Sequence, residues 1–142
     1  MLNSKQQGNI TEVEVIVAFL KYGYNVLTPY GDCERYDFVV DIHIHFYKIQ
    51  VKSAKEEDEG AKISFSTAST HYSNGKCIHD SYTKEEIDFF ATVHQGKIYL
   101  IPVEDCGTRT KSLRLKPTKN GQVSRTSWAK NYELEEVIKT LS

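Results

Sequence analysis

The sequence predicts an α/β fold, with one helix at the start of the chain, a mostly antiparallel central sheet and one helix at its end. Three observations predict it. Residues 10–22 and residues 131–141 have the apolar spacing of helices, and residues 36–53 and 87–103 are patterned as β-hairpins. Of the 142 residues, 39% are hydrophobic and 26% are charged, so we expect a single globular domain over residues 1–142.

The first predicted helix begins near Ile10 and ends near Tyr22. Asn9, with Glu12 three residues later, has the spacing of a capping box, and Gly23 is a natural helix stop. Glu12 also falls on the apolar side of the helical wheel, where an unpaired carboxylate is costly. Two interpretations stay open: Glu12 caps its own helix, or it faces a partner from another element. The apolar arc of this wheel consists of Val13, Ile16, Val17, Phe19 and Leu20.

The middle of the chain is predicted to form short strands. Residues 24–29 form a strand that ends at a proline, and residues 36–42 and 45–53 form an antiparallel hairpin. The later elements follow in chain order: an acidic loop at 55–60, a strand at 62–67, a long polar loop at 71–86, a hairpin at 87–103 with a glycine in its turn, a short strand at 113–115 and a helix at about 131–141.

The turn of the hairpin at 36–53 decides which of its side chains meet. A turn near His43 and Ile44 sets Asp37 opposite Gln50 on one face, with Cβ atoms about 5 Å apart. Lys52 then lies about 7 Å further along that face. The hairpin therefore gathers a carboxylate, an amide and an amine at one end.

Glu12 and Asp37, together with the amide oxygen of Gln50, form an oxygen-rich set that suits a hard divalent cation such as magnesium. A bound cation lowers the pKa of a water molecule and neutralises charge on a phosphate. Lys52 can orient or deprotonate that water, or stabilise the charge that develops on the phosphate. These residue types predict metal-assisted phosphodiester hydrolysis.

Charge is distributed unevenly along a chain whose formal net charge is −1. The segment 107–130 contains no Asp or Glu but many Lys and Arg residues, as expected of a phosphate-binding surface. The alternative is an ordinary solvated loop. The predicted phosphate contacts are Arg109, Lys111, Arg114 and Lys116 of this basic segment, with Arg35 and Lys55 near the candidate site.

Glu12 in a first helix, then Asp37, then Gln50-Val51-Lys52 resembles the PD-(D/E)XK nuclease superfamily in order and spacing. The wider pattern over residues 8–115 is similar to the group I intron-encoded homing endonucleases that use this fold. The resemblance implies a restriction-endonuclease-like core, in which a central mixed sheet is flanked by helices.

The resemblance also implies a role for each site residue. Glu12 and Asp37 would bind the metal ion, with the Gln50 amide oxygen and the Val51 carbonyl as further ligands. Lys52 would be the catalytic lysine, so the implied catalytic set is Glu12, Asp37, Gln50 and Lys52. The implied cofactor is Mg²⁺, for which Mn²⁺ can substitute.

Two positions depart from the family pattern. Tyr36 stands where a proline is common, and Gln50 stands where the family has Asp or Glu. A neutral ligand at position 50 removes one negative charge and should weaken metal binding. The intron-encoded members also have glutamine there, which favours an active enzyme.

The function expected from the sequence is that of a magnesium-dependent, site-specific double-strand DNA endonuclease of the homing type. One chain supplies one active site, so cutting both strands of a duplex implies a homo-oligomer, either a dimer or a tetramer built as a dimer of dimers. Two alternatives stay open. One is a structure-specific nuclease such as a Holliday junction resolvase, and the other is a non-catalytic DNA-binding module with a decayed site.

No apolar run approaches the roughly 18 residues that a membrane span needs, and the first residues do not resemble a signal peptide. We therefore expect a cytoplasmic, nucleoid-associated protein without a membrane partner.

Overall fold

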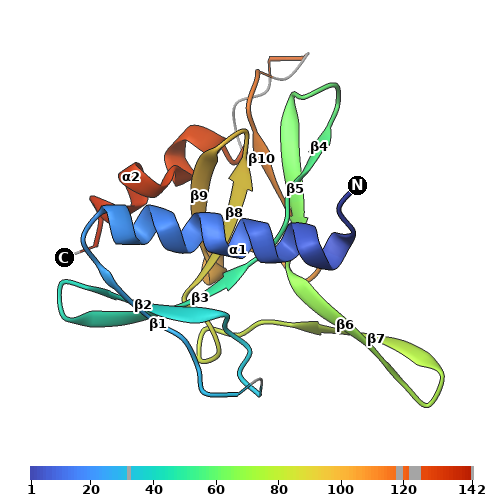
Figure 1. Cartoon of the computed structure of the whole chain (residues 1–142). Helices are drawn as coiled ribbons and strands as arrows, with labels where there is room; N and C mark the ends of the chain where they lie inside the picture. Colours follow the sequence, from blue (N-terminus) through green and yellow to red (C-terminus); the bar gives the residue numbers. More distant parts are fainter. Residues whose placement is uncertain (32, 118–119, 122–125, 142) are drawn as a thin grey trace.

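The computed structural model describes residues 1–31, 33–117, 120–121 and 126–141. Five strands form its central sheet: β1 (Asn25–Leu27), β2 (Phe38–Ile42), β3 (His45–Val51), β8 (Phe89–His94) and β9 (Lys97–Pro102). Their spatial order is β1-β2-β3-β8-β9 (Figure 1). β3 and β8 pair in parallel, whereas the other three pairings are antiparallel. The predicted mostly antiparallel sheet is confirmed, and the parallel pairing makes it the mixed sheet that the resemblance implies.

The first helix, α1 (Ser4–Lys21), begins earlier than predicted. Asn3 is its N-cap: the Asn3 side chain accepts from the Gln6 N–H, and the Gln6 side chain accepts from the Asn3 N–H, both at 2.9 Å. The capping box predicted at Asn9 and Glu12 is therefore wrong, because both residues lie inside the helix. The interpretation of Glu12 as a cap falls with it.

α1 lies across one face of the central sheet (Figure 1). Val15 and Phe19 are fully buried, and the Phe19 ring meets Phe38 edge to face at 6.0 Å. The helix is apolar on two sides, and the sheet covers only the side of Val15. Three members of the predicted apolar arc lie on the exposed side instead: Val13, Val17 and Leu20.

A second, three-stranded sheet covers the opposite face. It consists of β4 (Lys55–Glu57), β5 (Lys62–Ser66) and β10 (Thr110–Arg114), in the order β10-β5-β4. Phe65 of this sheet packs with Phe90 of the central sheet, ring centres 5.8 Å apart. The strands predicted at 62–67 and 113–115 are present with shifted ends. The segment predicted as a loop at 55–60 begins as a strand, because its first residues pair with β5.

The strands β6 (Ala68–Ser73) and β7 (Lys76–Ser81) form a hairpin that projects from the body of the molecule (Figure 1). The prediction of a polar loop over residues 71–86 is wrong for this part of the chain. The turn is Asn74-Gly75, with φ of 52° and 75°, and an Asn-Gly pair is a strong hairpin signal.

The last helix, α2 (Leu134–Ile138), is shorter than the helix predicted at 131–141, because Ala129–Tyr132 form a separate 3-10 helix. Leu134, Val137 and Ile138 join the core cluster of Val15 and Phe19, so α2 covers the same face as α1. Among the described residues, no helix combines the length and the apolar character needed to cross a membrane.

Candidate active site

The β2–β3 hairpin positions Asp37 against the strand that contains Gln50. The turn at His43 and Ile44, with φ of 53° and 67°, agrees with the prediction. The pairing runs from Ile42 opposite His45 to Phe38 opposite Ile49, and one further step along it sets Asp37 opposite Gln50. The register on which the predicted site depends is therefore present.

Two hydrogen bonds hold Asp37 at the edge of β3. Its N–H donates to the Ile49 carbonyl at 2.8 Å, and its carboxylate accepts from the Val51 N–H at 2.7 Å. One oxygen of the Asp37 side chain is therefore held by the backbone of β3. These two hydrogen bonds orient the carboxylate toward β3.

The pKa values of both carboxylates of the site are raised. Burial raises the pKa of Asp37, and the Val51 N–H and the Lys52 charge offset this only in part. Burial also raises the pKa of Glu12, and the charge of Asp37 raises it further. Glu12 on α1 and Asp37 before β2 are thus close enough to interact electrostatically, as the second interpretation of Glu12 requires.

The chemistry of these donors fits a hard divalent cation. Two carboxylates whose ionisation is opposed by burial would both be stabilised by a positive charge between them. The Gln50 amide and the Val51 carbonyl belong to the adjoining strand and can add neutral oxygen ligands. Within residues 1–31, 33–117, 120–121 and 126–141, no group of three or more His, Cys, Asp or Glu residues could hold a metal ion, so this donor set has two acids and depends on neutral oxygens.

The parallel pairing of β3 with β8 orients the end of β3, where Gln50, Val51 and Lys52 lie. Gln50 lies opposite Phe90, and the Lys52 N–H donates to the Ala91 carbonyl at 2.9 Å. Ile49 packs in the core under α1, whereas Phe90 belongs to the cluster on the opposite face. Gln50 and Lys52, which alternate with buried positions, therefore share the face away from α1.

The ammonium of Lys52 contacts the base of the projecting hairpin. Its Nζ donates to the carbonyl of Ala68 at 3.3 Å and lies 5.2 Å from the centre of the Tyr82 ring. Ala68 is the first residue of β6, and Tyr82 directly follows β7. Tyr82 in turn packs edge to face on Phe90 at 5.3 Å. Both ends of the hairpin thus meet the predicted catalytic lysine.

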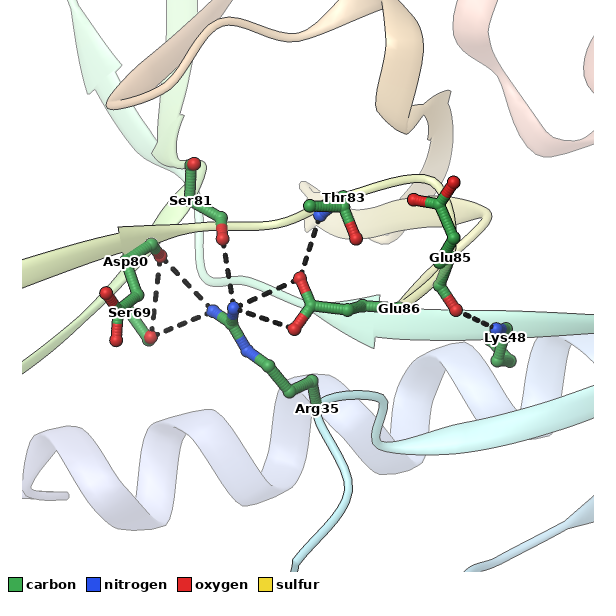
Figure 2. Close-up of polar contacts among 8 residues, drawn as sticks. All are labelled: Arg35, Lys48, Ser69, Asp80, Ser81, Thr83, Glu85 and Glu86. Atoms are coloured by element: carbon green, nitrogen blue, oxygen red, sulfur yellow. Dashed lines mark hydrogen bonds and ion pairs between the residues drawn. The ribbon is translucent and has the colours of Figure 1, made fainter.

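Arg35, two residues before Asp37, ties the same region together (Figure 2). Its guanidinium carbon lies 3.9 Å from the centre of the Tyr82 ring, and one of its nitrogens donates to both carboxylate oxygens of Glu86 at 3.1 and 3.2 Å. The remaining acceptors, at 2.9 to 3.2 Å, are the carbonyls of Ser81 and Asp80 and the hydroxyl of Ser69.

Figure 2 also shows how the segment after the hairpin is fastened to β3. The Lys48 ammonium donates to the Glu85 carbonyl, and the Lys48 N–H donates to the Asp88 carboxylate at 2.8 Å. Glu86 accepts from the Thr83 N–H at 2.9 Å, which closes the turn. Tyr82 and Glu86 were not among the predicted site residues. The Asn-Gly turn indicates the hairpin, but no sequence signal indicates its contact with Lys52.

The residues predicted to contact DNA differ in how far they are already engaged. Lys55, Arg109 and Lys116 are exposed. Lys111 donates to the Asp105 carbonyl at 2.9 Å and the Ser127 hydroxyl at 2.8 Å. Arg114 donates to two backbone carbonyls and lies 3.7 Å from a carboxylate oxygen of Asp58. Residues 118–119 and 122–125 of the basic segment lie outside the described residues. A role of these cations in DNA binding stays a prediction, as it does for Arg35.

Comparisons with known proteins show the family and the fold of the chain. A family model described as PD-(D/E)XK endonuclease matches residues 2–135. The solved structure of a bacterial homing endonuclease, I-Ssp6803I, is similar with a TM-score of 0.76 and 23% sequence identity, over 98% of this chain and 95% of that one. No curated protein matches the chain. At this identity the structural likeness establishes the fold.

Proposed function

The chain belongs to the PD-(D/E)XK endonuclease family, and from this premise we propose that it is a magnesium-dependent, site-specific double-strand DNA endonuclease of the homing type. The observation that supports the proposal most directly is the placement of Asp37. Its carboxylate is fixed by the Val51 N–H at 2.7 Å, and it interacts electrostatically with both Glu12 and Lys52. Glu12, Asp37 and Lys52 are three of the four positions that the family pattern joins, and the fourth, Gln50, lies opposite Asp37 in the hairpin.

The proposed metal ligands are Glu12, Asp37, the Gln50 amide oxygen and the Val51 carbonyl. A magnesium ion held there would activate a water molecule and neutralise charge on the scissile phosphate, and manganese can replace it. One oxygen of Asp37 accepts the hydrogen bond from the Val51 N–H, and the other oxygen would bind the cation. Gln50 contributes no charge, so the proposed site binds its cation more weakly than a site with three acids.

Lys52 is the proposed catalytic lysine. The Ala68 carbonyl at 3.3 Å and the ring of Tyr82 hold its ammonium at the base of the projecting hairpin, where its charge acts to lower the pKa of Asp37. From there it can orient the attacking water and stabilise negative charge that develops on the phosphate. The proton of the water passes to solvent or to a neighbouring group at this end of the sheet.

The proposed partner is double-stranded DNA, which places the protein's work in the cytoplasm at the nucleoid. Lys55, Arg109 and Lys116 are exposed and can bind phosphates directly. Lys111, Arg114 and Arg35 would have to share donors that now bind protein acceptors. Two cuts in one duplex need at least two copies of the chain, so the proposed state is a homodimer or a tetramer built from two dimers.

A specific observation also favours a second candidate function. Gln50 removes one negative charge from the proposed metal site, as expected of a DNA-binding module whose catalytic site has decayed. Such a module would bind DNA with strong salt dependence and would not cut it in any divalent metal ion.

Cleavage assays test the proposed function. The wild type, Asp37→Ala and Lys52→Ala would be incubated with duplex DNA pools and with four-way junctions, in magnesium or in EDTA. Asp41→Ala, on the same hairpin but outside the site, is the matched control. We expect discrete magnesium-dependent cuts in duplex DNA, unchanged in the control and reduced about 100-fold or more in the two site variants.

Other outcomes of these assays separate the alternatives. Cleavage confined to junctions would favour a structure-specific nuclease such as a resolvase. Binding by every variant without cutting would leave the DNA-binding module.

A further inference from the structure

The outer face of α1 is apolar and faces solvent. Ile10, Val13, Val17 and Leu20 have exposed fractions of 40%, 57%, 41% and 52%, on the side of the helix away from the sheet. A groove of about 550 Å³ follows the same side of α1 and is completed by Ile98 of β9. Four solvent-facing aliphatic residues in line on one helix form a contiguous patch of the kind that marks an interaction surface.

The spacing of these four residues is that of a coiled-coil seam. They occur at i, i+3, i+7 and i+10, which are the a and d positions of two consecutive heptads. Glu14 and Lys21 border the seam, and both line the groove. Each directly follows a d residue, so the two charges occupy the same heptad position, e. Neither forms a salt bridge with any other residue that the structure describes.

We propose that this face of α1 is the interface with a second copy of the chain, with the two helices antiparallel about a two-fold axis. In that register Val13 packs against Val17 of the second copy, and Ile10 against Leu20 of the second copy. Helical side chains lean toward the N-terminus of their own helix. Glu14 and Lys21 of the second copy therefore lean toward each other, and the symmetry makes this ion pair twice.

The charges select this arrangement over the parallel one. Parallel helices pair e residues with g residues of the partner, and the g positions that border this seam within α1 are the uncharged Asn9 and Ile16. Only an antiparallel pair brings e against e, where the chain has one acid and one base. Because a single helix supplies both halves of the pair, the face is self-complementary, as the interface between identical copies about a two-fold axis must be.

The proposed function needs two copies of the chain, and this interface would join them. The proposal rests on the proposed function only for this purpose of the dimer. The association itself needs no DNA and no metal ion. It can therefore be measured on an inactive protein.

Sedimentation equilibrium of the full chain, without DNA and in EDTA, tests the interface. Glu14→Lys and Lys21→Glu each place like charges opposite each other, and we expect each to weaken dimerisation at least about tenfold at low salt. The key sample is an equimolar mixture of the two variants. Every cross-copy pair in the mixed dimer again joins a base and an acid, so we expect association to recover.

Matched controls separate the interface from a general effect of charge. Lys5→Glu makes the same change in net charge as Lys21→Glu, on an exposed part of α1 outside the seam, and we expect it to leave dimerisation unchanged. Val17→Asp introduces a charge at the centre of the seam and should leave the smaller species at every concentration tested. The variants must keep the circular dichroism spectrum of the wild type, since all of these side chains are exposed.

Three results would overturn the inference: a wild type that is monomeric at about 100 µM, single variants that associate like the wild type, or a mixture that does not recover. The nuclease assay gives an independent reading. If the wild type linearises plasmids, we expect Val17→Asp to nick them instead. If the wild type cuts DNA and the α1 variants associate as the wild type does, the interface is refuted and the proposed function stands. If the wild type associates as expected but does not cut DNA, the proposed function is refuted and the interface stands.

Discussion

The Nζ of Lys52 lies 5.2 Å from the centre of the Tyr82 ring, on a residue that directly follows the projecting hairpin. On the basis of this contact, we expect Tyr82→Leu to lower the cleavage rate about tenfold, because a cation–π contact of 0.5 to about 2 kcal/mol that positions the ammonium is lost. Tyr82→Phe keeps the ring and should retain most of the activity. The measurement is a single-turnover rate beside the DNA dissociation constant in EDTA. A loss of affinity with an unchanged rate would show that Tyr82 acts in binding instead.

The network of Arg35 predicts a loss of stability in addition to a loss of activity. Arg35→Met removes its hydrogen bonds to Glu86, Ser81, Asp80 and Ser69. We expect the free energy of unfolding to fall by about 1–2 kcal/mol. The loss is no larger because both partners of the ion pair are partly exposed, so solvent screens their attraction. Urea denaturation measures it. The exposed pair of Lys139 and Glu136 is the control, since Lys139→Met should leave the free energy of unfolding nearly unchanged. Equal losses in the two variants would mean that the Arg35 network is no more than a surface ion pair.

The raised pKa values of Asp37 and Glu12 give a pH dependence with a defined sign. The folded state binds these protons more tightly than the unfolded state, so the stabilisation is complete below the ordinary pKa and is lost as the pH rises through the raised pKa. At pH 7 in EDTA we therefore expect Asp37→Asn to have a higher melting temperature than the wild type. The difference should shrink as the pH falls toward 3.8, the ordinary pKa of an Asp side chain.

The same pair of proteins reports on the metal site. Magnesium chloride should raise the melting temperature of the wild type, because a ligand that binds only the folded state stabilises it. Asp37→Asn should respond much less. An Asp37→Asn protein that is less stable than the wild type at pH 7 in EDTA would mean that the hydrogen bond from Val51 needs the charged carboxylate.

Gln50→Glu restores the acid that the family pattern has at this position. A third carboxylate should lower the magnesium concentration for half-maximal cleavage about tenfold, since charge count is a main determinant of divalent-ion affinity. Gln7→Glu makes the same chemical change on the exposed surface of α1 and should not alter the magnesium titration. An unchanged titration in Gln50→Glu would remove position 50 from the proposed ligand set.

The turn of the β2–β3 hairpin predicts a stabilising substitution. Ile44 has φ of 67° and is 91% exposed, so a β-branched residue occupies a left-handed conformation without compensating packing. Ile44→Gly should raise the free energy of unfolding by about 1 kcal/mol. The left-handed conformation costs residues with a side chain about 1–2 kcal/mol, whereas glycine adopts it without that steric cost. Thermal denaturation checks this, and a lower melting temperature would show that the Ile44 side chain has a packing role.

The register of the β2–β3 hairpin could be predicted from the sequence because the information that sets it is local. The turn at His43 and Ile44 and the alternation on both sides are sufficient to set Asp37 opposite Gln50, and the structure has that register. The start of α1 was predicted wrongly because two segments satisfy the same rule. Asn3 with Gln6 and Asn9 with Glu12 both have capping-box spacing, and local sequence does not distinguish them.

The contacts around Lys52 could not be predicted, for a different reason. Ala68, Tyr82 and Arg35 come from three separate segments, and only the tertiary structure brings them together. The exposed side of α1 was misjudged on similar grounds. A helix with apolar residues on two sides does not reveal which side the sheet covers, and the sheet covers the side of Val15.

The parallel pairing of β3 with β8 has a consequence for the time at which the protein becomes able to cut. Gln50 and Phe90 are neighbours in space, yet β4, β5, β6 and β7 all lie between them in the chain. During synthesis the ribosome releases Asp37 and Lys52 long before β8. While the four intervening strands are being made, β3 therefore lacks its parallel neighbour. Contacts of such sequence separation form late and slowly. A nascent chain therefore cannot pair the end of β3 that contains Gln50 with its parallel neighbour until β8 (Phe89–His94), about two-thirds of the way along the 142 residues, has been released.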